Sequence, residues 1–412
     1  MQGGVTFNGD LFAFQERGAR WLAFEGGKYL ADEQRVGKTP QLIRAADLVC
    51  ADHVVVTCPA SAIGVWERAI PRWSAGLWTY VIGSYDRHTD HGLPVGDVYI
   101  FDEAHRLKSF EAQRTQALLG KASPARRARF VWAASGTPAP NHSAELLPWL
   151  SFWGVWTQGR DAFLKRFCQF KRGPHNTIKV LGNKRSALPE LRALWEPLHL
   201  RRLRKEVMPY ELEPVEDDII LHAYGVEPGA QLYSIQIGED DLPDEDDEHF
   251  ATVCRLVGEA KAGPLGRFLA DELDDGEGKV AVYYWHESVG DELAAILGRF
   301  GVARVDGKVP AGAKRTAQAD RFNDDPACRV FLGQIMAAGE AIDLAKSCHS
   351  FVFAERSWTP GQNSQAAARL SGHLQTQRVL IRTAVLRGTL DEGQGHVLRR
   401  KSASLAQLHG EP

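Results

Sequence analysis

The sequence predicts an α/β protein built from two parallel-sheet lobes, and three observations lead to this prediction. The chain has 412 residues, a length that suits two domains of about 150 to 200 residues each. In both halves, short β-rich apolar runs alternate with longer stretches of helical periodicity, which is typical of βαβ units around a parallel sheet. Most of these runs end in small or polar residues, where the carboxyl end of a strand opens into a loop that can hold a ligand.

The predicted strands share a composition rich in valine, isoleucine and aromatic residues. In the first half they lie within 26–33, 53–59, 97–103 and 129–138, and in the second half within 279–286, 328–334, 350–356 and 378–386. Helical patterns occur at 40–50, 287–301 and 311–324. Because the alternation runs through both halves, we expect each half to fold as an α/β lobe.

Changes in composition predict the domain boundaries. The first lobe is expected over 1–147 and the second over 223–396. Residues 148–222 are richer in tryptophan, leucine and basic residues and lack clear strand alternation, so we expect a helical insertion and an inter-lobe linker there. An acidic helical insertion is expected near 225–260, and a frayed C-terminal tail over 397–412.

The composition is that of a globular chain, with 44% hydrophobic and 25% charged residues. No apolar run approaches the ~20 residues of a membrane-spanning helix, and the N-terminus lacks a signal-peptide pattern, so we expect a cytoplasmic protein with no membrane partner. The net charge is −3, but it is unevenly distributed. Acidic residues crowd 238–250, whereas basic residues crowd 165–185 and 201–205. Each cluster is either a solvated face or a contact surface.

The stretch "LADEQRVGKTPQ", residues 30–41, resembles a phosphate-binding loop. Gly37, Lys38 and Thr39 supply flexible backbone, a lysine for phosphate oxygens and a hydroxyl for Mg²⁺. Asp32 stands where the first glycine of the motif is usual, and Arg35 replaces another glycine. We expect Arg35 to be tolerated only if this position keeps an ordinary negative φ, with the side chain pointing to solvent.

A second motif, "VYIFDEAH", ends a predicted strand about sixty residues further on. Asp102 is placed to hold Mg²⁺ through its water shell, and Glu103 to orient an attacking water. A carboxylate pair at this position can also be a helix cap. A third motif, "WAASGTP", carries hydroxyls at Ser135 and Thr137 that suit a link between the γ-phosphate and the chain.

The order of these motifs resembles the Swi/Snf-type DNA-dependent ATPases of helicase superfamily two. The similar pieces include "LFAFQERGARWL", "LADEQRVGKT", "FDEAHRLKS", "ASGTPAPN", "LHLRRLRKEV" and "FAERSWTPGQNSQAAARL", and the last of these leans toward the annealing-helicase and compact phage or bacterial branch. The resemblance implies two RecA-like lobes of P-loop NTPase type, ATP and Mg²⁺ as cofactors, and double-stranded DNA as a largely sequence-independent partner. It also implies a location in a bacterial or phage-infected cell, while any protein partner stays unknown.

The resemblance also implies roles for individual residues. Gln15 resembles the glutamine that reads adenine, and Phe14 beside it is expected to pack near the base. His105, which completes a DEAH sequence, resembles the residue that couples the lobes. Arg369 resembles the first arginine of motif six, which approaches the γ-phosphate, and Gln365 precedes it at the family spacing.

One departure from the family bears on turnover. The second arginine of motif six is Gly372 in this chain, so we expect slow ATP hydrolysis. His373, Arg378 and Arg35 are candidates for a substitute cation, but sequence spacing does not choose among them. Gly372 leaves open one alternative to an active DNA translocase, a hydrolysis-deficient nucleotide-sensing DNA clamp. A second alternative is the motor subunit of a restriction or defence assembly, because no convincing nuclease, methylase or histone-reading segment accompanies the motor.

Candidate DNA contacts are spread over both lobes, because a translocase must hold the backbone with one lobe while the other advances. Each candidate is a loop at the end of a predicted strand, a basic segment or an aromatic residue. The candidates are the loop after Pro59, the segment around Arg106 and Lys108, the loop 337–343, Trp358, and the basic stretches 165–185 and 201–205. For Trp358, a place in the core is the alternative.

Overall fold

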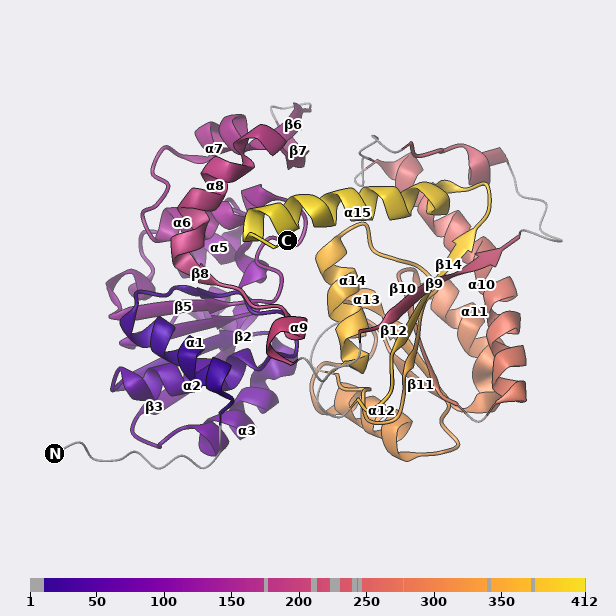
Figure 1. Cartoon of the computed structure of the whole chain (residues 1–412), viewed down its shortest axis with the longest axis horizontal. Helices are drawn as coiled ribbons and strands as arrows, with labels where there is room; N and C mark the ends of the chain where they lie inside the picture. The colour runs from indigo at the N-terminus through magenta and orange to yellow at the C-terminus, as the bar shows by residue number, and fades with distance from the viewer. Residues whose placement is uncertain are drawn as a thin grey trace. The chain divides into compact units, whose positions relative to one another are not determined.

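The computed structural model describes residues 11–173, 177–208, 213–222, 230–238, 243, 247–276, 278–338, 342–371 and 375–411 (Figure 1). The chain forms two compact units, one of Met1–Met208 with Ala403–Pro412 and the other of Pro209–Ser402. Each unit contains a six-stranded sheet in which every paired strand is parallel. The predicted α/β class with two parallel-sheet lobes is therefore confirmed.

The first sheet has the order β3-β2-β4-β5-β1-β8. Its strands are β1 (Tyr29–Leu30), β2 (His53–Cys58), β3 (Thr79–Ser84), β4 (Val98–Asp102), β5 (Phe130–Ala134) and β8 (His199–Leu200). The helices around it are α1 (Ala13–Phe24), α2 (Lys38–Leu48), α3 (Ile63–Trp73), α4 (Tyr85–His91), α5 (Gln113–Leu119) and the short α9 (Arg204–Val207). The valines of β2 are buried on both faces, as expected for a parallel strand covered by helices on both sides.

The region expected to be a helical insertion also contains strands. Its elements are α6 (Leu147–Phe152), α7 (Arg160–Phe167), β6 (Cys168–Arg172), β7 (Ile178–Asn183) and α8 (Leu188–Trp195). Strands β6 and β7 form an antiparallel hairpin with an irregularity between Gln169 and Phe170. The purely helical expectation was wrong because this irregularity and the many basic residues obscure the two-residue alternation of a strand.

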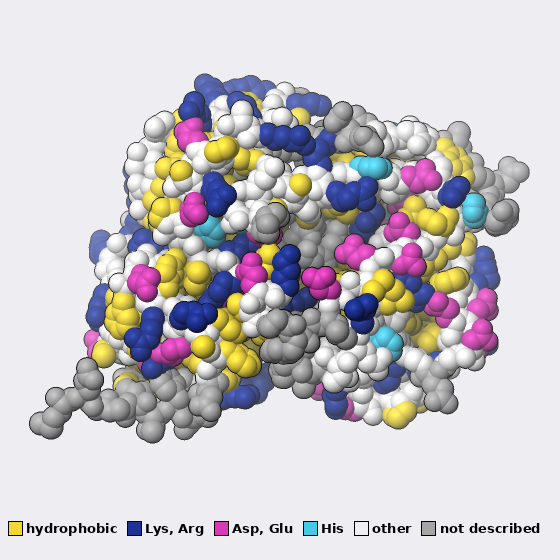
Figure 2. All heavy atoms as spheres, in the orientation of Figure 1, with side chains coloured by type: hydrophobic (Ala, Val, Ile, Leu, Met, Phe, Trp, Pro, Cys, Tyr) yellow, Lys and Arg dark blue, Asp and Glu magenta, His cyan; other side chains and the backbone are white. Residues whose placement is uncertain are grey.

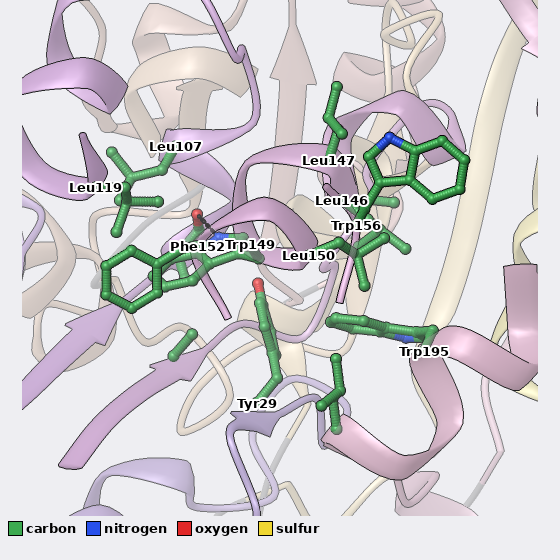
Figure 3. Packing of buried hydrophobic residues seen from close by; sticks show 14 of the residues in the cluster. Tyr29, Leu107, Leu119, Leu146, Leu147, Trp149, Leu150, Phe152, Trp156 and Trp195 are labelled. Atoms are coloured by element: carbon green, nitrogen blue, oxygen red, sulfur yellow. Dashed lines mark hydrogen bonds between the residues drawn. The ribbon is translucent and has the colours of Figure 1, made fainter. Parts of the chain in front are cut away.

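Aromatic packing joins this insertion to the first sheet. The ring of Tyr29 lies between Trp149 and Trp195, with centroid distances of 6.0 and 5.2 Å (Figure 3). All three side chains are fully buried. Because each ring removes a large apolar area from water, the insertion belongs to the core of the first unit rather than to a flexible linker.

The second sheet has the order β11-β12-β10-β13-β14-β9. Its strands are β9 (Val215–Leu221), β10 (Val280–Tyr284), β11 (Val302–Val305), β12 (Val330–Gln334), β13 (Ser350–Phe353) and β14 (Leu380–Leu386). The associated helices are α10 (Glu248–Asp275), α11 (Glu287–Leu297), α12 (Ala313–Asp324), α13 (Ile335–Ala338), α14 (Pro360–Ala367) and α15 (Leu390–His409). Helix α15 begins in the second unit, and its last residues belong to the first.

The unit boundaries differ from those expected. Strand β9 lies in the expected linker, yet it pairs with β14 over its whole length and so belongs to the second sheet. Within the acidic helical insertion expected near 225–260, residues 248–260 belong to α10, which buries an apolar face that includes Val253, Val257 and Leu265, whereas most of the acidic residues expected there lie outside the described residues. The tail expected to fray is helical to His409, and Leu408 is fully buried in the first unit. Within the described ranges, we find no helix with the length and hydropathy of a membrane span.

Candidate functional site

The loop between β1 and α2 needs glycine at its last position. Gly37 caps the N-terminus of α2 with φ 81° and ψ 60°, in the left-handed region that glycine adopts at little cost. A Cβ atom at Gly37 would collide with the side-chain amide of Gln15. Helix α2 then begins at Lys38, followed by Thr39, so its first backbone N–H groups lie next to both side chains. Such a helix N-terminus favours anions.

Lys38 is held by the loop that precedes it. Its Nζ atom donates hydrogen bonds to the backbone oxygens of Asp32 at 2.9 Å and Glu33 at 3.1 Å. Burial lowers the pKa of Lys38, and the nearby carboxylates of Glu103 and Asp32 oppose that shift. The ammonium group therefore lies in a partly desolvated position close to the carboxylates at the end of β4.

Arg35 does not have the backbone conformation expected for it. Its φ is 66°, in the left-handed region, and the residue is only partly exposed. The condition of a negative φ, on which tolerance of Arg35 was expected to depend, is therefore not met. A left-handed conformation costs a residue with a Cβ atom about 1 to 2 kcal/mol, so the surrounding loop stabilises a locally strained position.

Asp32, at another position where glycine is usual, is a fully buried acceptor. Gln41 Nε2 donates to its Oδ2 atom at 3.0 Å, and Arg202 Nε donates to its Oδ1 atom at 2.9 Å. Arg202 also donates to Gln41 Oε1 at 2.7 Å. The basic stretch 201–205 was expected to flank a duplex, but in the structure Arg202 is bonded to the phosphate-loop motif.

Arg201 is turned inward as well. Its Nη1 atom donates to the backbone oxygens of Ala31 at 2.8 Å and Gly136 at 2.9 Å, and its Nε atom pairs with Glu411. These contacts join the segment after β8 to the loops that follow β1 and β5. Sequence reasoning missed both arginines as parts of this site, because their partners lie far away in the chain.

Gln15 lies against the same loop from α1. The side chain is buried, its Nε2 atom donates to the backbone oxygen of Val36 at 3.1 Å, and its Oε1 atom accepts from the backbone N–H of Phe12 at 3.1 Å. The buried ring of Phe14 lies 5.2 Å from the guanidinium carbon of Arg202. The two residues expected to meet an adenine are thus adjacent to the loop that carries Lys38.

The carboxylates at the end of β4 have distinct surroundings. Asp102 accepts a hydrogen bond from Trp66 Nε1 at 2.8 Å and from the backbone N–H of Glu103 at 3.0 Å. Burial, followed by the neighbouring Glu103 carboxylate, raises the pKa of Asp102 to about 6. Glu103 itself has φ 50° and ψ 49°, a left-handed conformation that is uncommon for a residue with a side chain.

Ser135, at the end of β5, connects the acidic motif to the next one. Its hydroxyl donates to Glu103 Oε2 at 3.3 Å, lies 2.9 Å from His105 Nδ1, and accepts from the backbone N–H of Thr137 at 3.1 Å. His105 Nδ1 is also 3.3 Å from Glu103 Oε2. One fully buried serine therefore connects the second and third motifs, and the proposed link of Ser135 and Thr137 to the γ-phosphate stays a prediction.

The remaining predicted site residues lie in the second unit. Gln365 is buried on α14, and Arg369 donates from Nε to the Gln365 backbone oxygen at 3.1 Å and from Nη1 to the Ile342 backbone oxygen at 3.3 Å. Gly372 and His373 lie outside the described residues. The structure thus gathers the first-unit residues Gln15, Gly37, Lys38, Thr39, Asp102, Glu103 and His105 around one loop, and places Gln365 and Arg369 together in the other unit.

The residues around α2 and β4 fit a magnesium ion. Mg²⁺ prefers oxygen ligands and is usually held by one or two carboxylates together with phosphate oxygens and water. Thr39 offers a hydroxyl, and Asp102 a carboxyl whose raised pKa a nearby cation would lower. The donor set is therefore all oxygen, as this ion requires.

Two predicted DNA contacts have other partners. Trp358 packs on Phe250 with ring centroids 5.1 Å apart and lies against the second unit's core, which supports the core alternative for this residue. Lys108 pairs with Glu145 at 3.3 Å. Neither contact indicates a nucleic-acid surface.

Comparison with known proteins gives a consistent picture. A family model described as the SNF2-related domain matches residues 79–224. The DNA annealing helicase and endonuclease ZRANB3 of Bos taurus is 27% identical over 442 residues, covering 95% of this chain and 40% of that protein. A protein from Caenorhabditis elegans is 26% identical over 436 residues, covering 97% of this chain and 62% of that protein, and is named as a homolog of SWI/SNF-related matrix-associated actin-dependent regulator of chromatin subfamily A-like protein 1.

Among solved structures, the Sulfolobus solfataricus SWI2/SNF2 ATPase core in complex with dsDNA matches with a TM-score of 0.44 and 19% identity, covering 98% of this chain and 94% of that chain. The chain spans about 40% to 62% of the length of the two curated relatives named above.

Proposed function

The chain is a relative of the Swi/Snf-type ATPases of helicase superfamily two, and on this premise we propose that it is a DNA-dependent ATPase acting as a translocase or remodeller on double-stranded DNA. The observation that carries the proposal is the arrangement at the ends of β1, β4 and β5. There, Lys38 lies close enough to Asp102 and Glu103 for their charges to shift its pKa, and all three lie beside a helix N-terminus. A lysine, two carboxylates and free N–H groups together suit phosphoryl transfer.

ATP is proposed to bind the first unit. Gly37 and the start of α2 bind the phosphates through backbone N–H groups, while Lys38 exchanges its backbone partners for phosphate oxygens. Gln15 reads the adenine from its position beside Val36, and Phe14 packs near the base. The proposed ATP site therefore includes residues of both α1 and α2.

Magnesium is proposed as the resident metal, with Thr39 and Asp102 as its protein ligands. When bound, the ion neutralises charge on the phosphate oxygens. Asp102 must be ionised for this role, and the hydrogen bonds from Trp66 and from the Glu103 backbone both favour its ionised form.

Glu103 is proposed to orient the attacking water and accept its proton. Ser135 and His105 hold the Glu103 carboxylate from one side, which fixes its position relative to Lys38.

Arg369, in the second unit, is proposed to stabilise charge on the γ-phosphate, and Gln365 to position that arginine. His105 is proposed to transmit the nucleotide state between lobes.

Double-stranded DNA is proposed to bind through its phosphates, without strong sequence preference. The names of the similar proteins refer to DNA annealing and chromatin, which supports this class of partner. The second candidate function is a nucleotide-sensing DNA clamp, which Gly372 favours because it removes the second arginine of motif six.

Steady-state ATP hydrolysis with and without duplex DNA tests the proposal. We expect duplex to stimulate hydrolysis by the natural chain. Lys38→Ala should weaken nucleotide binding, whereas Glu103→Gln should bind ATP and hydrolyse it at least a hundredfold more slowly, roughly as for the loss of a general base. Glu25→Gln, which changes an exposed carboxylate of the same unit to which no role is assigned, is the control. Full turnover by Glu103→Gln would remove its assigned role, and nucleotide binding without duplex-stimulated turnover in the natural chain would favour the clamp.

A further inference from the structure

A cavity of about 330 Å³ lies in the first unit, at the amino ends of β1 and β5. Its lining comes mainly from the segments that precede these two strands, from β5 itself and from the end of α6. Strands β1 and β5 are parallel neighbours, so their carboxyl ends, which lead to Lys38 and Ser135, meet at the opposite end of the sheet. The cavity is therefore separate from the proposed ATP site.

The charged residues that line this cavity are all basic. They are Lys28, Arg126 and Arg129, and none of the described lining residues is acidic. Over much of the molecular face drawn in Figure 2, by contrast, basic and acidic side chains are interspersed. A concave surface with charges of one sign concentrates ions of the opposite sign, so the cavity favours an anion.

Aromatic rings hold the two guanidinium groups of this cavity. The guanidinium carbon of Arg126 lies 4.7 Å from the ring centre of Phe152, and that of Arg129 lies 5.1 Å from the ring centre of Phe130. Arg126 also donates to backbone oxygens, among them that of Gly120 at 3.0 Å. Within the described ranges neither arginine pairs with a carboxylate, so both positive charges are available to a ligand. Stacking on a ring orients a guanidinium before the ligand arrives.

Lys28 adds a third cation from the neighbouring strand. It directly precedes β1, is half-buried, and lines the same cavity as the two arginines. Its ammonium group has no hydrogen-bond or ion-pair partner in the part of the chain that the structure describes. The parallel pairing of β1 with β5 brings Lys28 to Arg129, although the two residues lie far apart in the sequence.

We propose that this cavity binds a small phosphorylated molecule that also carries an apolar ring. A phosphate monoester has a charge of about −1.5 to −2 at pH 7 and three acceptor oxygens, which match three cationic groups better than the single charge of a carboxylate does. Arginine in particular suits phosphate, because its planar group can donate two parallel hydrogen bonds. The proposal goes beyond the proposed function and does not depend on ATP hydrolysis.

The size and the walls of the cavity support a small organic ligand. Small-molecule sites typically have volumes of about 300 to 1,000 Å³, and the cavity lies at the lower end of this range. Such a volume admits a phosphorylated metabolite but not a DNA duplex. The ring of the ligand is inferred from the apolar part of the lining, which includes Leu22, Phe130, Phe152 and Trp153.

Calorimetric titration of the full chain with phenyl phosphate tests the proposal. We expect saturable binding to the natural chain, and binding at least tenfold weaker to Lys28→Gln/Arg129→Gln, because two of the three cations are removed. Phenyl phosphate should also bind at least tenfold more tightly than inorganic phosphate, because its ring contacts the apolar walls. The matched control is Lys121→Gln/Arg127→Gln, which removes two exposed basic groups that do not line the cavity and should bind phenyl phosphate like the natural chain.

Further variants separate this cavity from the nucleotide site and from a folding defect. Lys38→Ala should bind phenyl phosphate like the natural chain, because Lys38 lies at the other end of the sheet. Lys28→Arg keeps the positive charge and should retain the affinity. The thermal midpoint of Lys28→Gln/Arg129→Gln should stay close to that of the natural chain, because neither group has an ionic partner among the described residues.

Four results would overturn the proposal. They are no saturable binding of phenyl phosphate by the natural chain, equal affinities of the natural chain and the glutamine variant, loss of binding in Lys38→Ala, and an affinity for phenyl phosphate no higher than that for inorganic phosphate. If the glutamine variant loses affinity for a short DNA duplex but keeps its affinity for phenyl phosphate, these basic residues contact DNA instead. Duplex-stimulated ATP hydrolysis is measured independently, so this proposal and the proposed function can fail separately.

Discussion

Arg202 and Asp32 form a buried ion pair across 170 residues of sequence. Arg202 Nε donates to Asp32 Oδ1 at 2.9 Å, and its Nη2 atom pairs with Oδ2. Arg202 lies just after β8, six residues before the end of the first unit's main segment at Met208, whereas Asp32 belongs to the loop that carries Lys38. The pair therefore connects the segment that leaves the first unit to the residues proposed to hold ATP.

Loss of one partner of this pair should be costly. Arg202→Met leaves a buried carboxylate unpaired, and we expect it to lower the free energy of unfolding by about 3 to 5 kcal/mol. Arg202→Lys keeps the charge but loses the two-pronged geometry, so it should fold and bind ATP more weakly, with KM raised about tenfold and kcat little changed. Urea unfolding and steady-state kinetics measure these effects.

A surface arginine provides the comparison. Arg160→Met breaks an ion pair with Glu111 at 3.6 Å, and surface pairs contribute only about 0 to 1 kcal/mol. Equal losses of stability in Arg202→Met and Arg160→Met would show that the Arg202 pair is no more than a surface contact.

The left-handed backbone of Arg35 predicts a stabilising substitution. Arg35→Gly relieves the strain of φ 66° but increases the entropy of the unfolded chain, so we expect a net gain of up to about 1 kcal/mol in urea unfolding. Arg68→Gly, at an exposed position within α3, should instead lower the free energy of unfolding by about 1 kcal/mol, because glycine is unfavourable inside a helix. If Arg35 supplies a cation to the phosphates, Arg35→Gly will also weaken ATP binding; unchanged affinity removes Arg35 from the candidates.

The raised pKa of Asp102 predicts a pH-dependent contribution to stability. The folded chain binds this proton more tightly than the unfolded chain, because the pKa is about 6 in the fold against an ordinary value of 3.8. Burial thus destabilises the fold above about pH 6, and this penalty fades as the pH falls through 6. As the pH falls from 7 to 5, the free energy of unfolding of the natural chain should rise by about 1 to 2 kcal/mol relative to that of Asp102→Asn, in which residue 102 cannot titrate.

Asp86→Asn, which removes an exposed carboxylate of the same unit, serves as the control in these unfolding titrations. A constant stability difference between the natural chain and Asp102→Asn across this range would contradict the raised pKa. Asp102→Asn should also lose magnesium-dependent hydrolysis.

Gly372 predicts a gain of function, from the sequence alone. Gly372→Arg restores the second arginine of motif six, which acts on the transition state, so kcat should rise tenfold or more, equivalent to about 1.4 kcal/mol, with little change in nucleotide affinity. Gly372→Gln controls for the loss of glycine without adding charge. Brisk hydrolysis by the natural chain and no gain in Gly372→Arg would mean that another residue fills the role.

The central strands of both sheets were predictable because their apolar runs are strong and short. Strands β2, β4, β10 and β12 are buried parallel strands, and their sequences contain few polar residues. Strand β9 was missed because it contains Glu216, Asp217 and Asp218, which are exposed at the edge of the second sheet. Edge strands often carry charge, which hides their periodicity.

Within the site, local motifs were predictable and distant partners were not. Gly37, Lys38, Asp102 and Glu103 each belong to a short motif whose chemistry is visible in the sequence. The partner of Asp32 was not predictable from the sequence, because Arg202 lies 170 residues away and only the fold brings the two side chains together. The left-handed φ of Arg35 was not predictable for a related reason: the conformation of the loop is set by its surroundings rather than by the residue type alone.

The first unit is completed by a segment that is synthesised late. Leu408 is buried in its core, Ser404 binds the β7 residue Asn183, and Glu411 pairs with Arg201, yet residues 209–402 of the other unit come between. At a translation rate of about 5 to 20 residues per second, these roughly 195 residues delay that segment by about 10 to 40 seconds. During that interval on the ribosome, the nascent first unit exposes the apolar surface that Leu408 later covers, and it is then open to chaperones and proteases.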